Sequence, residues 1–223
     1  MRAESGDRAV WVDGRQPLSA RSVAAIAAVS DSAEDRGDRA MVVVHVSGAP
    51  DGSRARDLNV GLVSKWEREL RRLERLPATT IAVAVGDCGG IALDALLATD
   101  YRIADNSVRL LVPVKDGATW PGMALYRLAH QVGAAAIRRS VLFGAPLEVR
   151  DALALRLVDE VTDDTAGALA AVSEMTGALS GAELAIRRQL MFDAATVSFE
   201  EALGRHLAAC DRELRRSAAG VTS

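Results

Sequence analysis

The chain has 223 residues, 49% of them apolar, which is enough for one sizeable hydrophobic core. Its 27 lysines and arginines against 30 aspartates and glutamates give a formal net charge of −3, so the sequence predicts no binding to nucleic acid or to an anionic membrane. No stretch approaches the roughly 18 apolar residues of a membrane span, and the charged N-terminus does not resemble a signal peptide, which predicts a cytoplasmic protein.

The first half of the chain alternates between strand and helix patterns. β-Branched residues bounded by Gly and Asp predict strands over 8–13 and 41–47, with an amphipathic helix over 18–29 between them. Apolar residues spaced three and four apart then predict a second helix over 58–76, which Pro77 ends.

The charged face of the second helix supports two interpretations. Its arginines would suit the phosphates of a nucleotide, but glutamates are interleaved with them. Glu67 stands four residues before Arg71, the spacing of an ion pair within one helix. We therefore favour a solvated face. The arginines are Arg68, Arg71, Arg72 and Arg75.

A strand over 79–85 leads into a glycine turn at 86–90 and a buried helix over 91–99, with a short strand at 101–104 after it. A glycine turn before a helix presents unpaired backbone N–H groups, which suit a phosphate or a developing oxyanion. The turn lacks the Gly-Lys-Ser/Thr of a P-loop and the three-glycine spacing of a dinucleotide site. An oxyanion hole and a tight turn without chemical function remain as alternatives.

The second half of the chain is mainly helical. We expect residues 1–165 to form an α/β core and residues 166–223 a C-terminal helical region. The last two predicted helices carry apolar stripes that a chain of this size does not cover, which predicts a homo-oligomer. The patterns predict one strand, 158–161, and helices over 123–131, 134–142, 147–155, 166–179, 182–195 and 199–216.

The cysteines and histidines form no pattern of a metal site or a disulfide framework. Cys88 and Cys210 lie far apart in the sequence, which predicts reduced thiols. Cys88 precedes the paired glycines and would suit a nucleophile, but no base is spaced to activate it, so we favour a buried thiol. We expect no metal, since His45, His130 and His206 share no ligand spacing.

The segment from Pro77 to Ala104 resembles the signature region of the enoyl-CoA hydratase/isomerase (crotonase) family. In that family a strand ends in Asn-Gly, a triple glycine opens a helix with an acidic residue near its start, and Cys-Asp-x-Arg-Ile-Ala closes it. The resemblance spans roughly residues 40 to 215 and implies a spiral of ββα turns with a C-terminal helical oligomerisation region. The positions that match without a gap are Gly86, Gly90, Asp94, Asp100, Arg102, Ile103 and Ala104.

The resemblance implies that the chain holds an acyl-CoA thioester, as substrate rather than cofactor, with its carbonyl oxygen between two backbone N–H donors. One donor is the peptide nitrogen of Ile91, which follows Gly89 and Gly90. A well-placed donor of this kind contributes about 3 kcal/mol to transition-state stabilisation. The other belongs to the loop over 48–58, which is shorter than the family's and lacks its Ala-Gly-Ala-Asp, so it is not assigned.

The acid and base positions depart from the family pattern. Of the two glutamates that a hydratase uses, the first corresponds to Asp94 and the second to Val114, which cannot transfer a proton. Asp87 and Asp116 flank the expected pocket and would suit as replacements, although we favour a surface role for both. The resemblance thus implies a lyase with an incomplete acid/base pair. The residues implied to bind substrate are Gly89, Val114, Trp120 and Gly122.

A more particular resemblance is to the crotonase-like accessory proteins of dihydroxyphenylglycine biosynthesis in producers of glycopeptide antibiotics. The segments that carry it are 62–68, 86–90 and 119–129. It implies that the chain assists a type III polyketide synthase, beside sister crotonase-like enzymes, in forming 3,5-dihydroxyphenylacetyl-CoA by cyclisation and dehydration, and that it assembles as a trimer or hexamer. The alternatives are an ordinary hydratase or isomerase of a small enoyl-CoA and a non-catalytic partner of the synthase.

Overall fold

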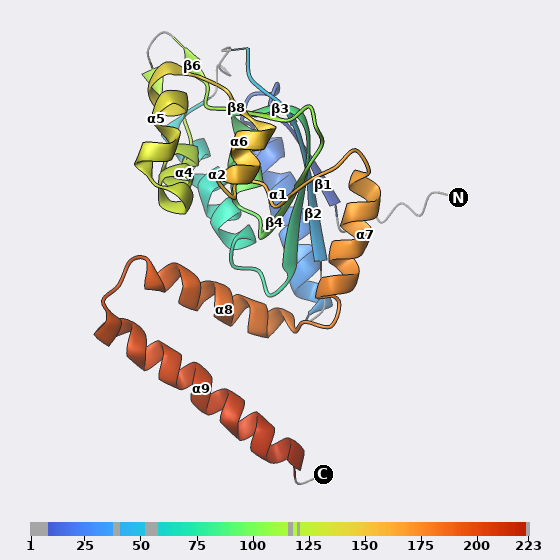
Figure 1. The fold of residues 1–223 in the computed structure, drawn as a ribbon, viewed down its shortest axis with the longest axis vertical. Helices are drawn as coiled ribbons and strands as arrows, with labels where there is room; N and C mark the ends of the chain where they lie inside the picture. The colour runs from blue at the N-terminus through green and yellow to red at the C-terminus, as the bar shows by residue number, and fades with distance from the viewer. Residues whose placement is uncertain (1–8, 38–40, 52–57, 116–117, 120, 222–223) are drawn as a thin grey trace.

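The computed structural model describes residues 9–37, 41–51, 58–115, 118–119 and 121–221, and within these ranges the chain has the predicted α/β fold. A seven-stranded sheet forms the centre, with helices on both faces (Figure 1). Five strands pair in parallel in the order β1-β2-β3-β4-β9; β5 pairs in parallel with β3, and β8 pairs antiparallel with β5. The strands are β1 (Ala9–Asp13), β2 (Met41–Gly48), β3 (Thr79–Gly89), β4 (Tyr101–Ala104), β5 (Arg109–Leu111), β8 (Leu147–Glu148) and β9 (Glu160–Val161).

The predicted turn at 86–90 proves to be mostly strand. β3 runs on to Gly89, pairing with β4 as far as Ala84 and with β5 from Asp87 onward. Gly86, at φ +66°, bends the strand between the two partners without ending it. Sequence reasoning also missed β5, β8 and the hairpin of β6 (Val114–Lys115) with β7 (Ala118–Thr119), because strands of two or three residues show no periodicity.

The predicted helices are present, with boundaries shifted by a few residues. Ser19 caps the first by accepting the Ser22 N–H, as expected for a serine at a helix start. No described helix combines the length and the apolar character that crossing a bilayer requires. The helices are α1 (Ala20–Arg36), α2 (Val60–Leu73), α3 (Ile91–Leu97), α4 (Ala124–Val132), α5 (Ala134–Phe143), α6 (Val149–Ala154), α7 (Thr165–Thr176), α8 (Gly181–Ala194) and α9 (Phe199–Val221).

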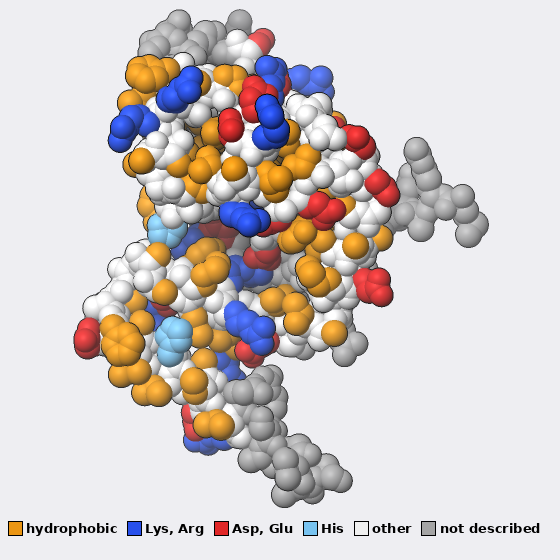
Figure 2. Space-filling model, viewed as in Figure 1, with side chains coloured by type: hydrophobic (Ala, Val, Ile, Leu, Met, Phe, Trp, Pro, Cys, Tyr) orange, Lys and Arg blue, Asp and Glu red, His pale blue; other side chains and the backbone are white. Residues whose placement is uncertain are grey.

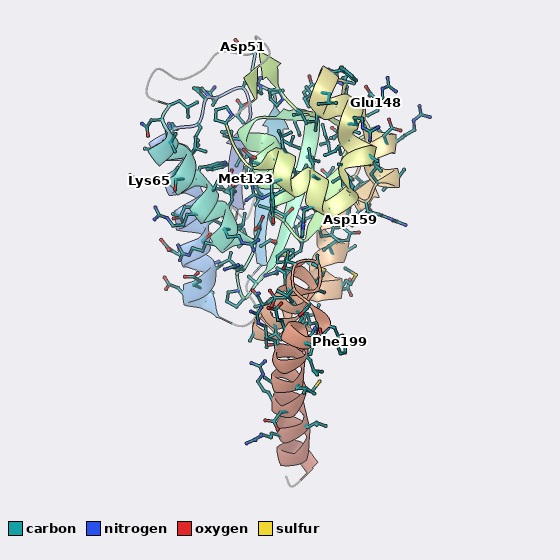
Figure 3. The ribbon with its side chains drawn as sticks, turned by 90° about the vertical axis from the view of Figure 1, so that its left-hand side faces the viewer. Asp51, Lys65, Met123, Glu148, Asp159 and Phe199 are labelled. Carbon is teal, nitrogen blue, oxygen red and sulfur yellow. The ribbon has the colours of Figure 1, made fainter. Side chains whose placement is uncertain are left out.

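The last two helices extend away from the sheet, and a buried arginine attaches them to it. Arg188 of α8 donates to the carbonyl oxygens of Leu76 and Ala78 and forms a two-pronged ion pair with Asp100. Between α8 and the rest of the protein lies a hollow of about 490 Å³ that contains both acidic and basic side chains (Figure 2). Beyond it α9 projects as an arm (Figure 3).

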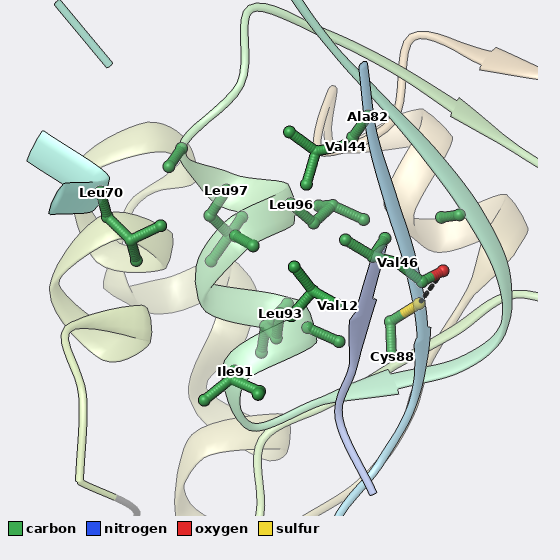
Figure 4. Packing of buried hydrophobic residues seen from close by; sticks show 14 of the residues in the cluster. Val12, Val44, Val46, Leu70, Ala82, Cys88, Ile91, Leu93, Leu96 and Leu97 are labelled. Atoms are coloured by element: carbon green, nitrogen blue, oxygen red, sulfur yellow. Dashed lines mark hydrogen bonds between the residues drawn. The ribbon is translucent and has the colours of Figure 1, made fainter. Parts of the chain in front are cut away.

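The main core lies between the sheet and helices α1, α2 and α3 (Figure 4). Every residue of α3 is buried, because this short helix packs against the sheet and α4 and meets Trp66 of α2. Side chains alternate along β3, so Ala82 faces this core while Ile81 and Val83 face α7 on the other side. The fold thus holds α3, and the chemistry predicted for it, inside the protein rather than on its surface.

Candidate active site

The start of α3 lies at the carboxyl ends of the parallel strands. Gly90, at φ +55°, is the N-cap residue and supplies no side-chain cap. Ile91 is the first residue of the helix, so its N–H has no acceptor within the helix. The Ile91 side chain is buried in the main core (Figure 4), which leaves the peptide nitrogen as the group it can offer to a ligand.

Four segments of the chain pack closely at this edge of the sheet. A Cβ at Gly14 would lie 2.2 Å from the Gly48 carbonyl oxygen and 2.3 Å from that of Gly89. At Gly89 a Cβ would lie 2.9 Å from the Ala49 side chain and 3.0 Å from the Leu111 carbonyl oxygen. Glycine is therefore required at residue 89 by contacts with the protein's own chain. The structure places this residue beside the loop in which the resemblance sets the second donor.

Asp94 lies one turn further along α3 and is fully buried. Its Oδ2 accepts a long hydrogen bond of 3.4 Å from the indole N–H of Trp66, whereas its Oδ1 has no partner among the described residues. Burial, and next the negative charge of Glu67, raise the pKa of Asp94 to about 7, against the opposing effects of Arg127 and the Trp66 indole. The carboxyl group is thus able to hold a proton near neutral pH.

Gly122 covers the Asp94 carboxyl group. A Cβ at this position would lie 2.6 Å from Oδ2 and 3.1 Å from Oδ1, so any side chain here would displace the carboxyl group. The structure therefore brings together two of the residues that the sequence assigned to the site. Of the others, Val114 lies in the β6–β7 hairpin with its side chain outside the described part, and Trp120 lies outside the described residues altogether.

A buried ion-pair network beside Asp94 was missed by the sequence reasoning. Arg127 of α4 pairs with Glu67 at 2.8 Å and with Glu74 at 2.7 Å, and all three side chains are largely buried. The ion pair expected between Glu67 and Arg71 was wrong, since Arg71 pairs with Glu74 instead, at 2.7 Å. The available signal was spacing: Glu67 and Glu74 are seven residues apart, which places them on one helix face beside the apolar stripe.

The comparisons with known proteins identify the family. No protein-family model matches the chain. A protein of Amycolatopsis orientalis named enoyl-CoA-hydratase is 55% identical over 214 residues, covering 96% of this chain and 99% of that protein. The chain belongs to the enoyl-CoA hydratase family.

Solved structures support the crotonase-type fold. The structure of an enoyl-CoA hydratase from Shewanella pealeana matches with a TM-score of 0.78 at 16% identity, over 93% of this chain and 84% of that one. A putative enoyl-CoA hydratase from Thermobifida fusca, in complex with acetoacetyl-CoA, matches with a TM-score of 0.76 at 16% identity, over 93% and 91% of the two chains. The crotonase-type fold that the family resemblance implied is confirmed.

The sequence offered three further candidate groups in this member of the enoyl-CoA hydratase family: Cys88, Asp87 and Asp116. Burial raises the pKa of the Cys88 thiol to about 12, which removes the thiolate at physiological pH and confirms the interpretation as a packed thiol. Asp87 pairs at the surface with Arg109 at 2.7 Å, in line with a surface role. Asp116 lies outside the described residues. Within the described ranges, no three His, Cys, Asp or Glu side chains gather to hold a metal ion.

Proposed function

We propose that the chain binds an acyl-CoA thioester and assists a type III polyketide synthase in forming 3,5-dihydroxyphenylacetyl-CoA. Membership of the enoyl-CoA hydratase family supports the thioester, as do Thermobifida fusca structures solved with acetoacetyl-CoA and with CoA. The accessory role rests on the more particular resemblance of segments 62–68, 86–90 and 119–129. The observation that carries the proposed chemistry is the position of the buried Asp94 carboxyl group, whose pKa is raised to about 7, one turn after the amide of Ile91 that begins α3.

The proposed step is a dehydration that drives aromatisation. The Ile91 N–H donates to the thioester oxygen and stabilises negative charge on it. Asp94 gives its proton to a leaving hydroxyl group, so that the C–O bond breaks and water departs. In the same step the other oxygen of this carboxyl group takes a proton from the carbon next to the thioester carbonyl, and the electrons of that C–H bond form the new C=C bond. Asp94 ends the step protonated, and one carboxyl group is sufficient.

The direct test adds purified protein to the synthase and malonyl-CoA and measures 3,5-dihydroxyphenylacetyl-CoA. We expect a higher yield with the protein than without it. With crotonyl-CoA alone, hydration should be about a hundredfold or more below that of a family member with both glutamates, because Val114 cannot act as acid or base. If the synthase yield were unchanged and crotonyl-CoA were hydrated at the full rate, the proposal would be wrong and the protein would be an ordinary hydratase.

The exposed apolar residues of the last two helices support assembly into a trimer or hexamer. Met191 of α8 is 63% exposed and Leu207 of α9 is 57% exposed. Leu203, Leu207, Cys210 and Leu214 of α9 are spaced alternately four and three residues apart, the spacing of a helix–helix seam. A second copy is the proposed cover, because large exposed apolar surfaces are rare on monomers.

Leu207→Glu is expected to shift the protein toward its 23.5 kDa monomer, since burying a charge in an apolar seam is unfavourable. Light scattering after size-exclusion chromatography measures the mass. Val60→Glu, which replaces an exposed apolar residue at the start of α2, is the matched control and should keep the wild-type mass. A monomeric wild-type protein would contradict the proposed assembly.

A further inference from the structure

Glu67 of α2 is fixed by two groups that lie beside Asp94. Its Oε1 accepts the backbone N–H of Met123 at 2.9 Å, and its Oε2 accepts from the guanidinium of Arg127 at 2.8 Å. The side chain is only 16% exposed. Because both carboxylate oxygens are already hydrogen-bonded, Glu67 is suited to holding other groups in place rather than to transferring protons itself.

The bond to Met123 fixes the segment that covers Asp94. Met123 directly follows Gly122, whose Cα faces the Asp94 carboxyl group so closely that a Cβ would lie 2.6 Å from Oδ2. Met123 is also the residue from which α4 begins, at the side of that helix that faces α2 (Figure 3). Glu67 therefore sets how closely the chain packs over the buried carboxyl group.

The charged groups around Asp94 come from the two helices packed against α3. Glu67 on α2 repels a charged Asp94, and Arg127 on α4 attracts it, with the repulsion the larger effect. Arg127 is also bound to Glu74, so its positive charge is divided between two carboxylates. α3 itself contains no other ionisable residue. The surroundings of Asp94 therefore favour its neutral form.

We propose that Glu67 is a positioning residue for Asp94: it holds segment 122–124 against the carboxyl group and places a negative charge beside it. The inference rests on the proposed role of Asp94 as proton donor. It explains how one carboxyl group can begin the reaction as an acid where Val114 has replaced the second glutamate of the family pattern. Glu67 supplies the charge that favours this state without contacting the substrate.

The test measures the titration of Asp94 directly by NMR of protein labelled with ¹³C-aspartate, with the Asp94 signal assigned by its loss in Asp94→Asn. In the wild type we expect a midpoint of about 7. Glu67→Gln removes the repulsion and leaves the attraction of Arg127, so the pKa of Asp94 should fall by about one unit or more. Glu67→Asp retains the charge and should restore titration in the neutral range.

Glu69→Gln is the matched control, because Glu69 is on the same helix but faces Arg72 rather than Asp94. It should leave the Asp94 midpoint unchanged. A wild-type midpoint in folded Glu67→Gln would overturn the inference. The titration requires no acyl-CoA, so it still tests the role of Glu67 if the synthase assay shows no effect of the protein. Conversely, Asp94→Asn could lose activity while Glu67→Gln leaves the titration midpoint of Asp94 unchanged. That result would refute only the role of Glu67.

Discussion

Asp94→Asn should lower the rate at which the protein assists the synthase by about 10²- to 10⁴-fold, the contribution of a positioned acid or base. The amide keeps the size of the carboxyl group but cannot give up a proton to a leaving hydroxyl group. The measurement is the initial rate of product formation at fixed synthase concentration. Binding of the acyl-CoA should change much less, because the Ile91 N–H remains in place.

Asp87→Asn is the control for this substitution. Asp87 is also a carboxylate near the end of β3, but it pairs with Arg109 at the surface. Its replacement should leave the rate within a factor of two or so of the wild type. If Asp94→Asn retained the full effect on the synthase, the protein would act as a binding partner and not through proton transfer.

Asp94→Asn is also expected to change how the stability of the protein depends on pH. The pKa of Asp94 is raised from an ordinary 3.8 to about 7, so its contribution to stability is complete below about pH 4 and is lost as pH rises through 7. Asp94→Asn cannot ionise and has no such loss. Relative to the wild type, the variant should therefore gain up to about 4 kcal/mol of unfolding free energy between about pH 4 and pH 8, measured by urea unfolding.

Arg127→Met should reduce the free energy of unfolding by about 3–5 kcal/mol, the typical effect of removing one partner from a buried ion pair. Arg127 holds Glu67 and Glu74 together, and its own side chain is 8% exposed. Methionine fills similar volume but leaves a buried carboxylate without its guanidinium. Denaturant unfolding at neutral pH measures the loss.

The matched control for the buried pair is Arg109→Met. Arg109 forms an ion pair of similar length with Asp87, but both side chains are well exposed, so water screens the interaction. This variant should unfold close to the wild type. Equal losses from the two substitutions would mean that burial does not determine the strength of these pairs in this protein.

The fold was largely predictable because its strongest signals are local. The β-branched run of β2, the apolar spacing of α2 and the glycine-rich end of β3 each identify an element without knowledge of its neighbours. The extension of β3 past Gly86 was not predictable, because it depends on β5 as a partner, and three residues of strand carry no period of their own.

The candidate site was predictable only in part. The motif located Asp94 and Gly122, but their contact depends on the packing of α4 against α3. The roles of Glu67 and Arg127 depend on a pairing across sixty residues, which one sequence does not reveal. The glutamates interleaved with the arginines of α2 instead favoured a solvated face, because glutamate and arginine are rarely buried unless paired.

Arg188 of α8 binds Leu76, Ala78 and Asp100, and so attaches the C-terminal helices to the α/β core. These acceptors flank the start of β3, the strand whose far end delivers Gly90 and Ile91. Without α8, the carbonyl groups of Leu76 and Ala78 and the carboxylate of Asp100 would lose the Arg188 guanidinium, and without α7 the side chains of Ile81 and Val83 would meet water. The helices after residue 165 therefore support the strand that leads to the proposed oxyanion donor.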